Sequence, residues 1–267
     1  MDNKKYLVVA SKRDRAGINI TTHLSQFQNP KKFDFYLVEE EIIFTENLDL
    51  EKINKYDFII FASRHKSTKE KRTLSIHPVG NFREAKSGGV KGKLGKCSAL
   101  FQKKLFEKLN ENTIKYGLKD YDVTLETTHH GPLIDKPSVF VEIGSTNREY
   151  KDRRAGFVIA KSISEAIEEF KENPYNEVAI GIGGPHYCPN FNKIQLKSNV
   201  AISHIIPSYA FPLTEDMVRE AIEKTHEEID FALIDWKSIG NAEQRQEILN
   251  VLDKLYVSYK KTSEISK

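Results

Sequence analysis

The sequence has few cysteines, with only Cys97 and Cys188 in 267 residues. Two cysteines cannot form a disulfide framework, so we expect both thiols to be reduced. Long apolar runs are also missing: none approaches the roughly 18 residues that span a bilayer, and Tyr6–Ala10 is too short for a signal-peptide core. We therefore expect a cytoplasmic protein without a membrane segment, long enough to bury its own hydrophobic core.

A large excess of one charge is absent too, because 41 basic residues face 38 acidic ones and the net charge is +3. Between Arg64 and Lys96, however, basic residues far outnumber the acidic Glu70 and Glu84. Such a concentration favours binding of a polyanion, since each neutralised phosphate releases condensed counterions. A solvated surface that keeps the protein soluble is the alternative interpretation.

Internal repeats and low-complexity linkers are likewise absent, and short strands alternate with helices. Runs rich in Val, Ile and Phe predict strands at 6–10, 34–38, 57–62, 73–77, 123–127, 139–143, 178–182, 201–205 and 231–235. Helical spacing predicts helices within 97–116, 147–172, 215–227 and 241–259. The pattern predicts an α/β fold in a single domain over 1–267, with a mixed central sheet covered by helices.

A flexible basic insertion is expected around residues 84–96, where lysines alternate with glycines. It does not match a nucleotide P-loop, because the spacing from Gly89 to Gly95 is one residue too long and Cys97 replaces the metal-binding hydroxyl. The segment Gly181–Gly184 does not match a dinucleotide fingerprint either, because Pro185 follows it. A mobile loop that closes over the end of a nucleic acid agrees better with this composition.

Two adjacent histidines, His129 and His130, follow the strand predicted at 123–127. Neighbouring residues of a strand point to opposite faces, so these imidazoles share a site only if the chain is already turning. Gly131 and Pro132 favour such a turn. A structural role for either histidine is the alternative.

Glu142 interrupts an apolar strand, on the face opposite Val139, Val141 and Ile143. In a sheet covered on both faces this carboxylate would be buried, which is costly unless it is paired or bound to a metal. We interpret Glu142 as a general base or a metal ligand. An ion pair, or an edge strand exposed to water, is the alternative.

The turn Gly181–Asn190 carries His186 and Cys188 just after a predicted strand. Imidazole and thiolate are ligands that zinc favours, and their alternation could present both to one face. The chain has too few cysteines for a closed structural site, so zinc here would borrow ligands from other strands and keep a position open for water. Cys188 as a nucleophile, or as an inert buried thiol, is the alternative.

Histidines stand at further strand ends as His65, His77 and His204, and the segments around all these histidines resemble the archaeal and plant type of D-aminoacyl-tRNA deacylase. The resemblance rests on Ser63-Arg64-His65, Ile76-His77-Pro78-Val79-Gly80-Asn81, Thr128-His129-His130-Gly131-Pro132, Val141-Glu142-Ile143-Gly144-Ser145-Thr146, Gly181-Ile182-Gly183-Gly184-Pro185-His186-Tyr187 and His204-Ile205-Ile206-Pro207. It extends from the first strand to near the C-terminus. One position departs from it, since Tyr150 stands where the family often has tryptophan.

The resemblance implies a zinc-dependent hydrolase that cleaves the ester between a D-amino acid and the 3′ end of tRNA, with a fold similar to peptidyl-tRNA hydrolases and nucleoside phosphorylases. In the mechanism that we expect, zinc is the cofactor and the protein is a monomer. The expected metal ligands are His129, His186 and Cys188. The expected catalytic groups are Glu142, His130 and, as oxyanion donors, the amides of Gly183 and Gly184. The expected tRNA-binding residues are Arg64, Lys66, Lys86, Lys91, Lys93 and Lys96.

Three other functions agree with parts of the sequence. A peptidyl-tRNA hydrolase-like or phosphorylase-like enzyme would use the same scaffold, and N-blocked substrates would distinguish it. A non-catalytic RNA-binding module would explain the basic residues but not histidines at five strand ends. A structural zinc protein would unfold on chelation instead of losing activity alone.

Overall fold

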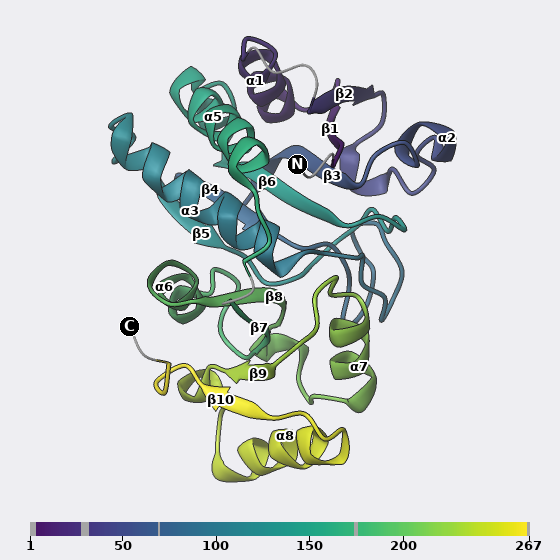
Figure 1. Ribbon diagram of the computed structural model, residues 1–267, viewed down its shortest axis with the longest axis vertical. Coiled ribbons are helices and arrows are strands. Elements are labelled where there is room, and N and C mark those ends of the chain that lie inside the picture. Colours follow the sequence, from purple (N-terminus) through teal and green to yellow (C-terminus); the bar gives the residue numbers. More distant parts are fainter. Residues whose placement is uncertain (1–3, 28–31, 69, 174–175, 266–267) are drawn as a thin grey trace.

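The computed structural model describes residues 4–27, 32–68, 70–173 and 176–265, which contain two β-sheets (Figure 1). The first has the order β2-β1-β3-β6-β4-β5. Its strands are β1 Tyr6–Ser11, β2 Phe33–Val38, β3 Phe58–Lys66, β4 Thr73–His77, β5 Asp122–Leu125 and β6 Ser138–Ser145. Because β4 pairs antiparallel with β6 and every other pair is parallel, the sheet is mixed, and the prediction of a mixed α/β fold is confirmed.

The second sheet is parallel throughout, with the order β10-β9-β7-β8. Its strands are β7 Glu177–Ile182, β8 Val200–Ile206, β9 Phe231–Ile234 and β10 Tyr259–Lys261. The sequence predicted one central sheet, so this division is a correction. Apolar periodicity identifies a strand but not the strand that it pairs with.

Helices α1 Arg15–Leu24, α3 Ala99–Lys115 and α5 Arg153–Glu169 cover one face of the first sheet. The helix predicted at 147–172 is divided in two, because Thr146 caps the short α4 Asn147–Tyr150 and Asp152 then caps α5. Asp14 caps α1, which the sequence analysis missed. The remaining helices are α2 Leu50–Ile53, α6 Pro189–Lys197, α7 Glu215–Glu223 and α8 Ala242–Lys254.

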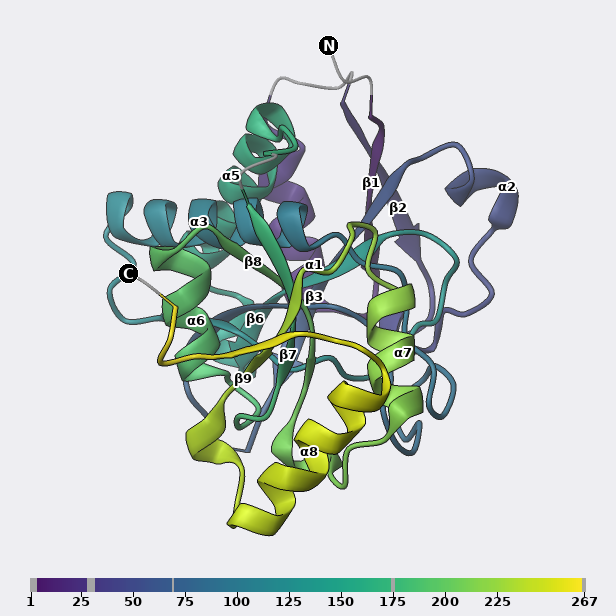
Figure 2. The same ribbon diagram turned by 60° about the horizontal axis from the view of Figure 1, so that its bottom comes forward.

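Helix α3 joins the two sheets, since it contacts β4 and β5 of the first sheet and β8 of the second. One continuous hydrophobic cluster includes Val141 of β6, Phe106 of α3 and Leu233 of β9. The buried Gln102 of α3 also donates a hydrogen bond of 2.9 Å to the carbonyl of Ile202 in β8. Figure 2 shows the second sheet from below, with α8 and β10 brought forward.

The opposite face of the first sheet is not packed against the long helices α1, α3 and α5. Near β1 and β3, a second cluster packs Phe61 and Phe140 against residues outside the sheet that include Ile42, Val79 and Ile134. Farther along β6, polar and titratable side chains replace the apolar ones. A functional site therefore lies on the sheet face that the long helices leave uncovered.

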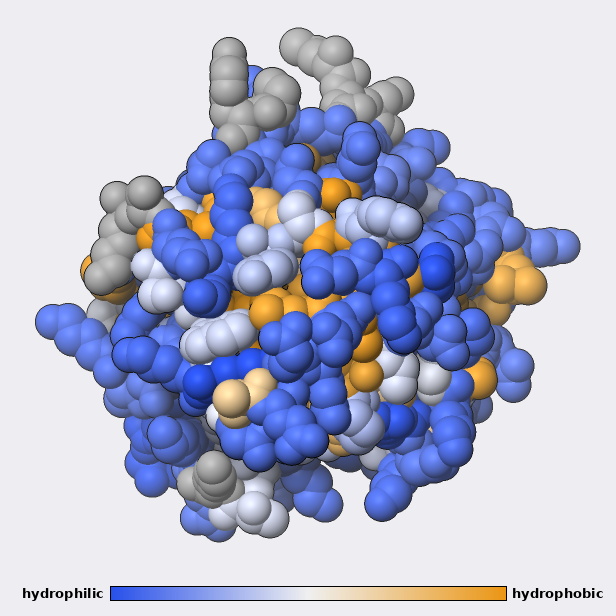
Figure 3. Space-filling view, turned by 90° about the horizontal axis from the view of Figure 1, so that it is seen from below, coloured by the Kyte–Doolittle hydropathy of each residue, from blue (hydrophilic) through white to orange (hydrophobic). Residues whose placement is uncertain are grey.

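The surface of the second-sheet side is mostly hydrophilic, with apolar side chains in small groups between polar ones (Figure 3). Among the described residues, no helix is both long and apolar enough to cross a membrane.

Candidate active site

Strand register brings three chemically reactive side chains together around β6. Glu142 pairs with Ser63 of β3 on one side and with Ser75 of β4 on the other. His65 and His77 each lie two residues beyond these serines, so their side chains project from the same face as Glu142. Because β4 is antiparallel to β6, the two imidazoles reach Glu142 from opposite directions, at 3.4 Å for His65 Nδ1 and 3.7 Å for His77 Nε2.

Glu126, the first residue after β5, lies at the centre of the site with its side chain fully buried. Its carboxylate oxygens lie 3.1 Å from His65 Nδ1, 3.1 Å from His186 Nε2 and 3.5 Å from His129 Nε2. Neither oxygen has a partner with hydrogen-bond geometry among the described residues. Although burial raises the pKa of a carboxyl, His186 and His65 outweigh it and hold the pKa of Glu126 well below its usual range.

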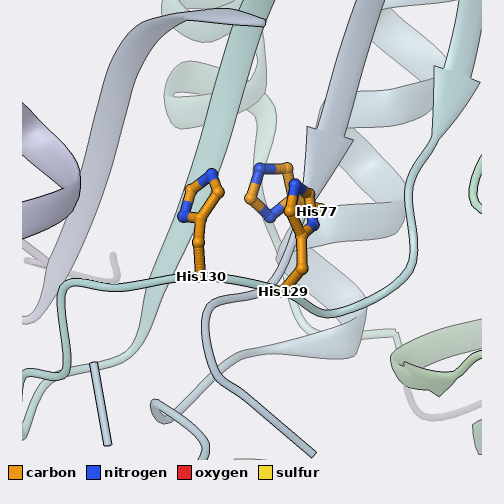
Figure 4. A group of neighbouring side chains, drawn as sticks. All are labelled: His77, His129 and His130. Atoms are coloured by element: carbon orange, nitrogen blue, oxygen red, sulfur yellow. The ribbon is translucent and has the colours of Figure 1, made fainter. Parts of the chain in front are cut away.

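Three imidazoles, those of His77, His129 and His130, lie side by side with ring centroids 4.0 to 4.8 Å apart (Figure 4). In each ring, Nδ1 lies 2.7 to 3.0 Å from a backbone carbonyl oxygen. Because a carbonyl only accepts, each Nδ1 carries a proton, so in the neutral form of each ring the lone pair is on Nε2. The buried Nε2 of His77 has no hydrogen-bond partner in the described part of the chain. Imidazoles oriented in this way are typical of metal ligands.

The turn after β5 agrees with the sequence prediction for the adjacent histidines. His130 has a φ of 46°, in the left-handed region, which lets its ring lie on the same side as that of His129. The ring of His130 also packs on Phe140 of β6, with centroids 4.8 Å apart. The hydrophobic cluster below the site therefore positions the histidines.

The residues of this site form three groups whose ligand atoms lie within 4.8 Å of one another. The groups are His77, His129 and His130; His65, Glu126 and His186; and His77, Glu126 and Glu142. Nitrogen and carboxylate oxygen are ligands that zinc accepts. The described residues therefore include a donor set that could hold a metal ion.

The pKa values divide the histidines of this donor set into two kinds. Burial lowers the pKa of His130 to about 4, and burial together with the neighbouring imidazoles lowers the pKa of His129 well below its usual range. The pKa of Glu142 falls to about 2, because His65 and His77 outweigh the effect of burial. Although burial lowers the pKa of a histidine, the carboxylates of Glu126 and Glu142 outweigh it, so the pKa of His65 is raised to about 11 and that of His77 is raised as well. A divalent cation would replace these protons, because it binds the deprotonated imidazole.

His186 comes from the second sheet, in the turn between β7 and α6. Its Nδ1 lies 3.4 Å from both Thr127 Oγ1 and Tyr209 OH, and these two hydroxyls lie 2.9 Å apart. A phenol and a threonine hydroxyl thus orient the ring whose Nε2 faces Glu126. The site is completed only where the two sheets meet.

The structure places Cys188 apart from this set. It lies at the N-cap of α6 with a φ of 48°, and its side chain is buried in the hydrophobic cluster. Its Sγ lies 3.4 Å from the carbonyl oxygen of His186 and 3.6 Å from that of Pro185, and burial raises the pKa of the thiol. Because the chain turns at this residue, alternation in the sequence does not bring Cys188 to the face of His186.

The amides of Gly183 and Gly184 differ from their expected role as oxyanion donors. Gly183 donates to the carbonyl of Ile206 at 2.8 Å, and Gly184 donates to Ser238 Oγ at 2.6 Å. Neither N–H is therefore free for a substrate. Both residues have positive φ values, 97° and 82°, and a Cβ on Gly183 would come within 2.6 Å of Ser238 Oγ. The turn needs glycine for its conformation and packing.

A cavity of about 500 Å³ opens beside the cluster, and Glu142, His65, His129, His130 and His186 all line it. Of the expected tRNA-binding residues, Arg64 and Lys66 line this cavity as well. Its size is within the range of small-molecule sites. The cluster thus has direct access to a substrate.

The other expected tRNA-binding residues lie on the 84–96 segment outside the cavity lining. Lys91, Lys93 and Lys96 form ion pairs with Glu84, Glu220 and Asp135, at 2.5, 3.2 and 2.7 Å. Lys86 is exposed. The segment is also tied to the rest of the protein, since the N–H of Gly89 donates to Glu46 and Leu94 is buried.

The sequence alone predicts no role for Glu126, and it identifies His65 and His77 only as histidines at strand ends. The available signal for Glu126 was its position directly after an apolar strand and three residues before His129. His204, by contrast, does not join the cluster. It is fully buried within β8, with Nδ1 3.1 Å from Thr128 Oγ1, and burial lowers its pKa to about 4.

Comparison with known proteins agrees with this site. The sequence profile described as D-aminoacyl-tRNA deacylase matches residues 52–260. A D-aminoacyl-tRNA deacylase of Methanocaldococcus jannaschii is 34% identical over 91% of this chain and 94% of its own length, and one of Archaeoglobus fulgidus is 37% identical over 88% and 89%. The crystal structure of a conserved protein of unknown function, AF0625, superposes with a TM-score of 0.88 at 31% identity, over 99% of this chain and 98% of that one. This chain belongs to the D-aminoacyl-tRNA deacylase family.

Proposed function

We propose that this chain hydrolyses the ester between a D-amino acid and the 3′ end of tRNA, as a zinc-dependent enzyme. The observation that supports it most is the convergence of histidines on two buried carboxylates, beside a cavity that Arg64 and Lys66 also line. A structural zinc site would be closed, whereas His129, His130 and His186 line an open cavity. The proposal includes the expected monomeric state and cytoplasmic location, which size-exclusion chromatography and cell fractionation would check.

The donor atoms fit zinc by number and type. His77, His129 and His130 would offer three Nε2 atoms, with His77 losing its additional proton when the metal binds, and Glu126 with His186 would offer a second set close by. When bound, zinc supplies a water molecule of lowered pKa and polarises the ester carbonyl. We assign His130 to this donor set, since its Nε2 lone pair lies with those of the other two rings.

Glu142 acts on the attacking water in this proposal. With a pKa near 2 it is ionised under all working conditions, so it accepts hydrogen bonds but holds a proton only briefly. It would orient the attacking water and accept its proton transiently. It would also hold His65 and His77 in place on either side. Arg64 and Lys66, which line the cavity, would contact the phosphates of the acceptor end.

The proposed substrate is tested with D-tyrosyl-tRNA and L-tyrosyl-tRNA in parallel. We expect rapid release of D-tyrosine and slow release of L-tyrosine, because rejection of L-isomers is what proofreading requires. N-acetylated aminoacyl-tRNA serves as a third substrate, since a peptidyl-tRNA hydrolase prefers it. Equal rates for both isomers would refute the proofreading role, and a preference for the N-acetylated ester would favour the peptidyl-tRNA hydrolase alternative.

Removal of the metal is expected to lower deacylase activity at least about tenfold without unfolding the protein, since the ligands lie beside a core that packs without them. The purified protein would be treated with a chelator and assayed before and after zinc is restored. Circular dichroism on the same samples provides the control. Full activity in zinc-free protein would refute the metal mechanism, and loss of the folded signal would instead indicate a structural zinc.

A further inference from the structure

The cavity beside the histidine cluster extends to a second group of residues that the proposed mechanism does not use. This group consists of Arg13, in the turn between β1 and α1, and of Ile43 and Phe44, in the 3-10 helix Ile42–Phe44. An aminoacyl-tRNA ester has two parts, the amino acid and the terminal nucleoside. A cavity with the reactive groups at one end needs a place for each part.

The 3-10 helix Ile42–Phe44 lies next to the turn that carries the adjacent histidines. A Cβ added to Gly131, the residue after His130, would come within 2.7 Å of the carbonyl oxygen of Ile43. The 3-10 helix therefore stands against the turn that carries His129 and His130. A ligand held on this helix would have its neighbouring ester close to the histidines.

Phe44 is unusual for a large apolar side chain, because 52% of its surface is exposed although it lines a cavity. Within the described residues it belongs to no hydrophobic cluster and to no aromatic pair. Its ring therefore does nothing for the core. Exposed aromatic rings in nucleic-acid sites are platforms on which a base stacks.

Arg13 is the cation at this end of the cavity. Arg64 forms an ion pair of 2.8 Å with Glu41, whereas the guanidinium of Arg13 has no ion pair or hydrogen bond among the described residues. The turn itself is fixed, since the N–H of Arg13 donates to Ser11 Oγ at 3.1 Å. A guanidinium on a fixed turn is suited to bind a phosphate.

We propose that this end of the cavity binds the 3′-terminal nucleotide of the tRNA, with the adenine stacked on Phe44 and its 5′-phosphate bound by Arg13. The proposal rests on the proposed function and names the part of the substrate that this end takes. The amino acid then lies toward His186 and Glu142. In this arrangement, different residues bind the nucleotide and the amino acid, so the affinity for the nucleotide can be measured without the amino acid.

The test uses adenosine 5′-monophosphate and adenosine, which contain the nucleotide without the amino acid. Their affinities are measured by calorimetry on zinc-loaded protein, which requires no turnover. We expect Phe44→Ala to weaken binding of both about tenfold, because one stacked base contributes about that factor. Arg13→Gln should weaken binding of the monophosphate about tenfold and leave that of adenosine unchanged.

Two matched variants control for the loss of an exposed ring and of a nearby charge. Phe35→Ala removes a partly exposed ring on β2, outside the cavity lining. Lys12→Gln removes the charge next to Arg13, which is paired with Glu39 at 2.5 Å and also lies outside the lining. Both should bind the two ligands like the wild type.

Kinetics on two substrates separate the nucleotide from the amino acid. With Phe44→Ala, KM should rise by the same factor for D-alanyl-tRNA and D-tyrosyl-tRNA, with little change in kcat. A rise for D-tyrosyl-tRNA alone would mean that Phe44 contacts the amino acid, and would overturn the proposal. The proposal would also be overturned if the protein did not bind adenosine 5′-monophosphate at millimolar concentration, or if Phe44→Ala and Arg13→Gln bound it as well as their control variants do. If the protein binds the monophosphate through Phe44 but hydrolyses no D-aminoacyl-tRNA, the proposed function fails while this site stands.

Discussion

Replacement of Glu126 by Gln is expected to remove most of the zinc and to lower turnover of D-tyrosyl-tRNA at least about a thousandfold. Loss of a supporting residue typically costs 10- to 100-fold, and Glu126 has a more central place. Its buried oxygens lie within 3.5 Å of three imidazoles and have no hydrogen-bond partner among the described residues. Glutamine lacks the charge and presents an NH2 group where a second lone pair is needed. Zinc content and single-turnover rates would be measured together.

The matched control is Glu149→Gln, which changes another buried carboxylate in the same way. Glu149 accepts hydrogen bonds from the N–H and the hydroxyl of Thr146 at the start of α4, outside all three donor groups. This variant should lose about 1 kcal/mol of stability, typical of a weakened helix cap, and keep its zinc and its rate. Glu126→Gln with wild-type zinc content and rate would exclude the carboxylate from the site.

Replacement of Glu142 by Gln should lower kcat about 100- to 1000-fold while most of the zinc is retained. The carboxylate lies 3.7 Å from His77 Nε2, and the group of His77, His129 and His130 is complete without it. A neutral amide cannot take a proton from water, and KM should change little because Glu142 acts on the water and not on the tRNA. Turnover would be measured at saturating D-tyrosyl-tRNA, with zinc content determined on the same samples.

Two other outcomes would lead to different conclusions for Glu142. If the variant loses zinc in proportion to its rate, Glu142 is a ligand, as the group of His77, Glu126 and Glu142 permits. If kcat stays within a few fold of wild type, Glu142 has no part in the chemistry. In that case the buried carboxylate would serve only to pair with His65 and His77.

Local patterns predicted much of the fold and part of the site. Alternation in β6 placed Glu142 opposite Val141 and Ile143, and its side chain is indeed buried. The Gly131-Pro132 pair predicted the turn that lets His129 and His130 share a site, and the positive φ of His130 confirms it. These predictions needed only a few neighbouring residues.

The features of the site that could not be predicted depend on contacts between residues that are far apart in the sequence. The helix between β7 and β8 was missed, and Cys188, at its start, turns away from His186. The amides of Gly183 and Gly184 are used by Ile206 and Ser238, which no local pattern reveals. Likewise, Glu126 could be recognised only once the strands had placed three histidines around it.

The position of His186 on the second sheet has a mechanical consequence. All other members of the donor groups belong to the first sheet or to the segment that follows β5. A divalent ion that binds ligands from both sheets would hold the two sheets together. A movement of one sheet past the other along α3 would then change the distance between His186 and Glu126. Occupancy by the ion and rigidity of the sheet–sheet junction would then be linked, so that the melting temperature would rise with zinc concentration.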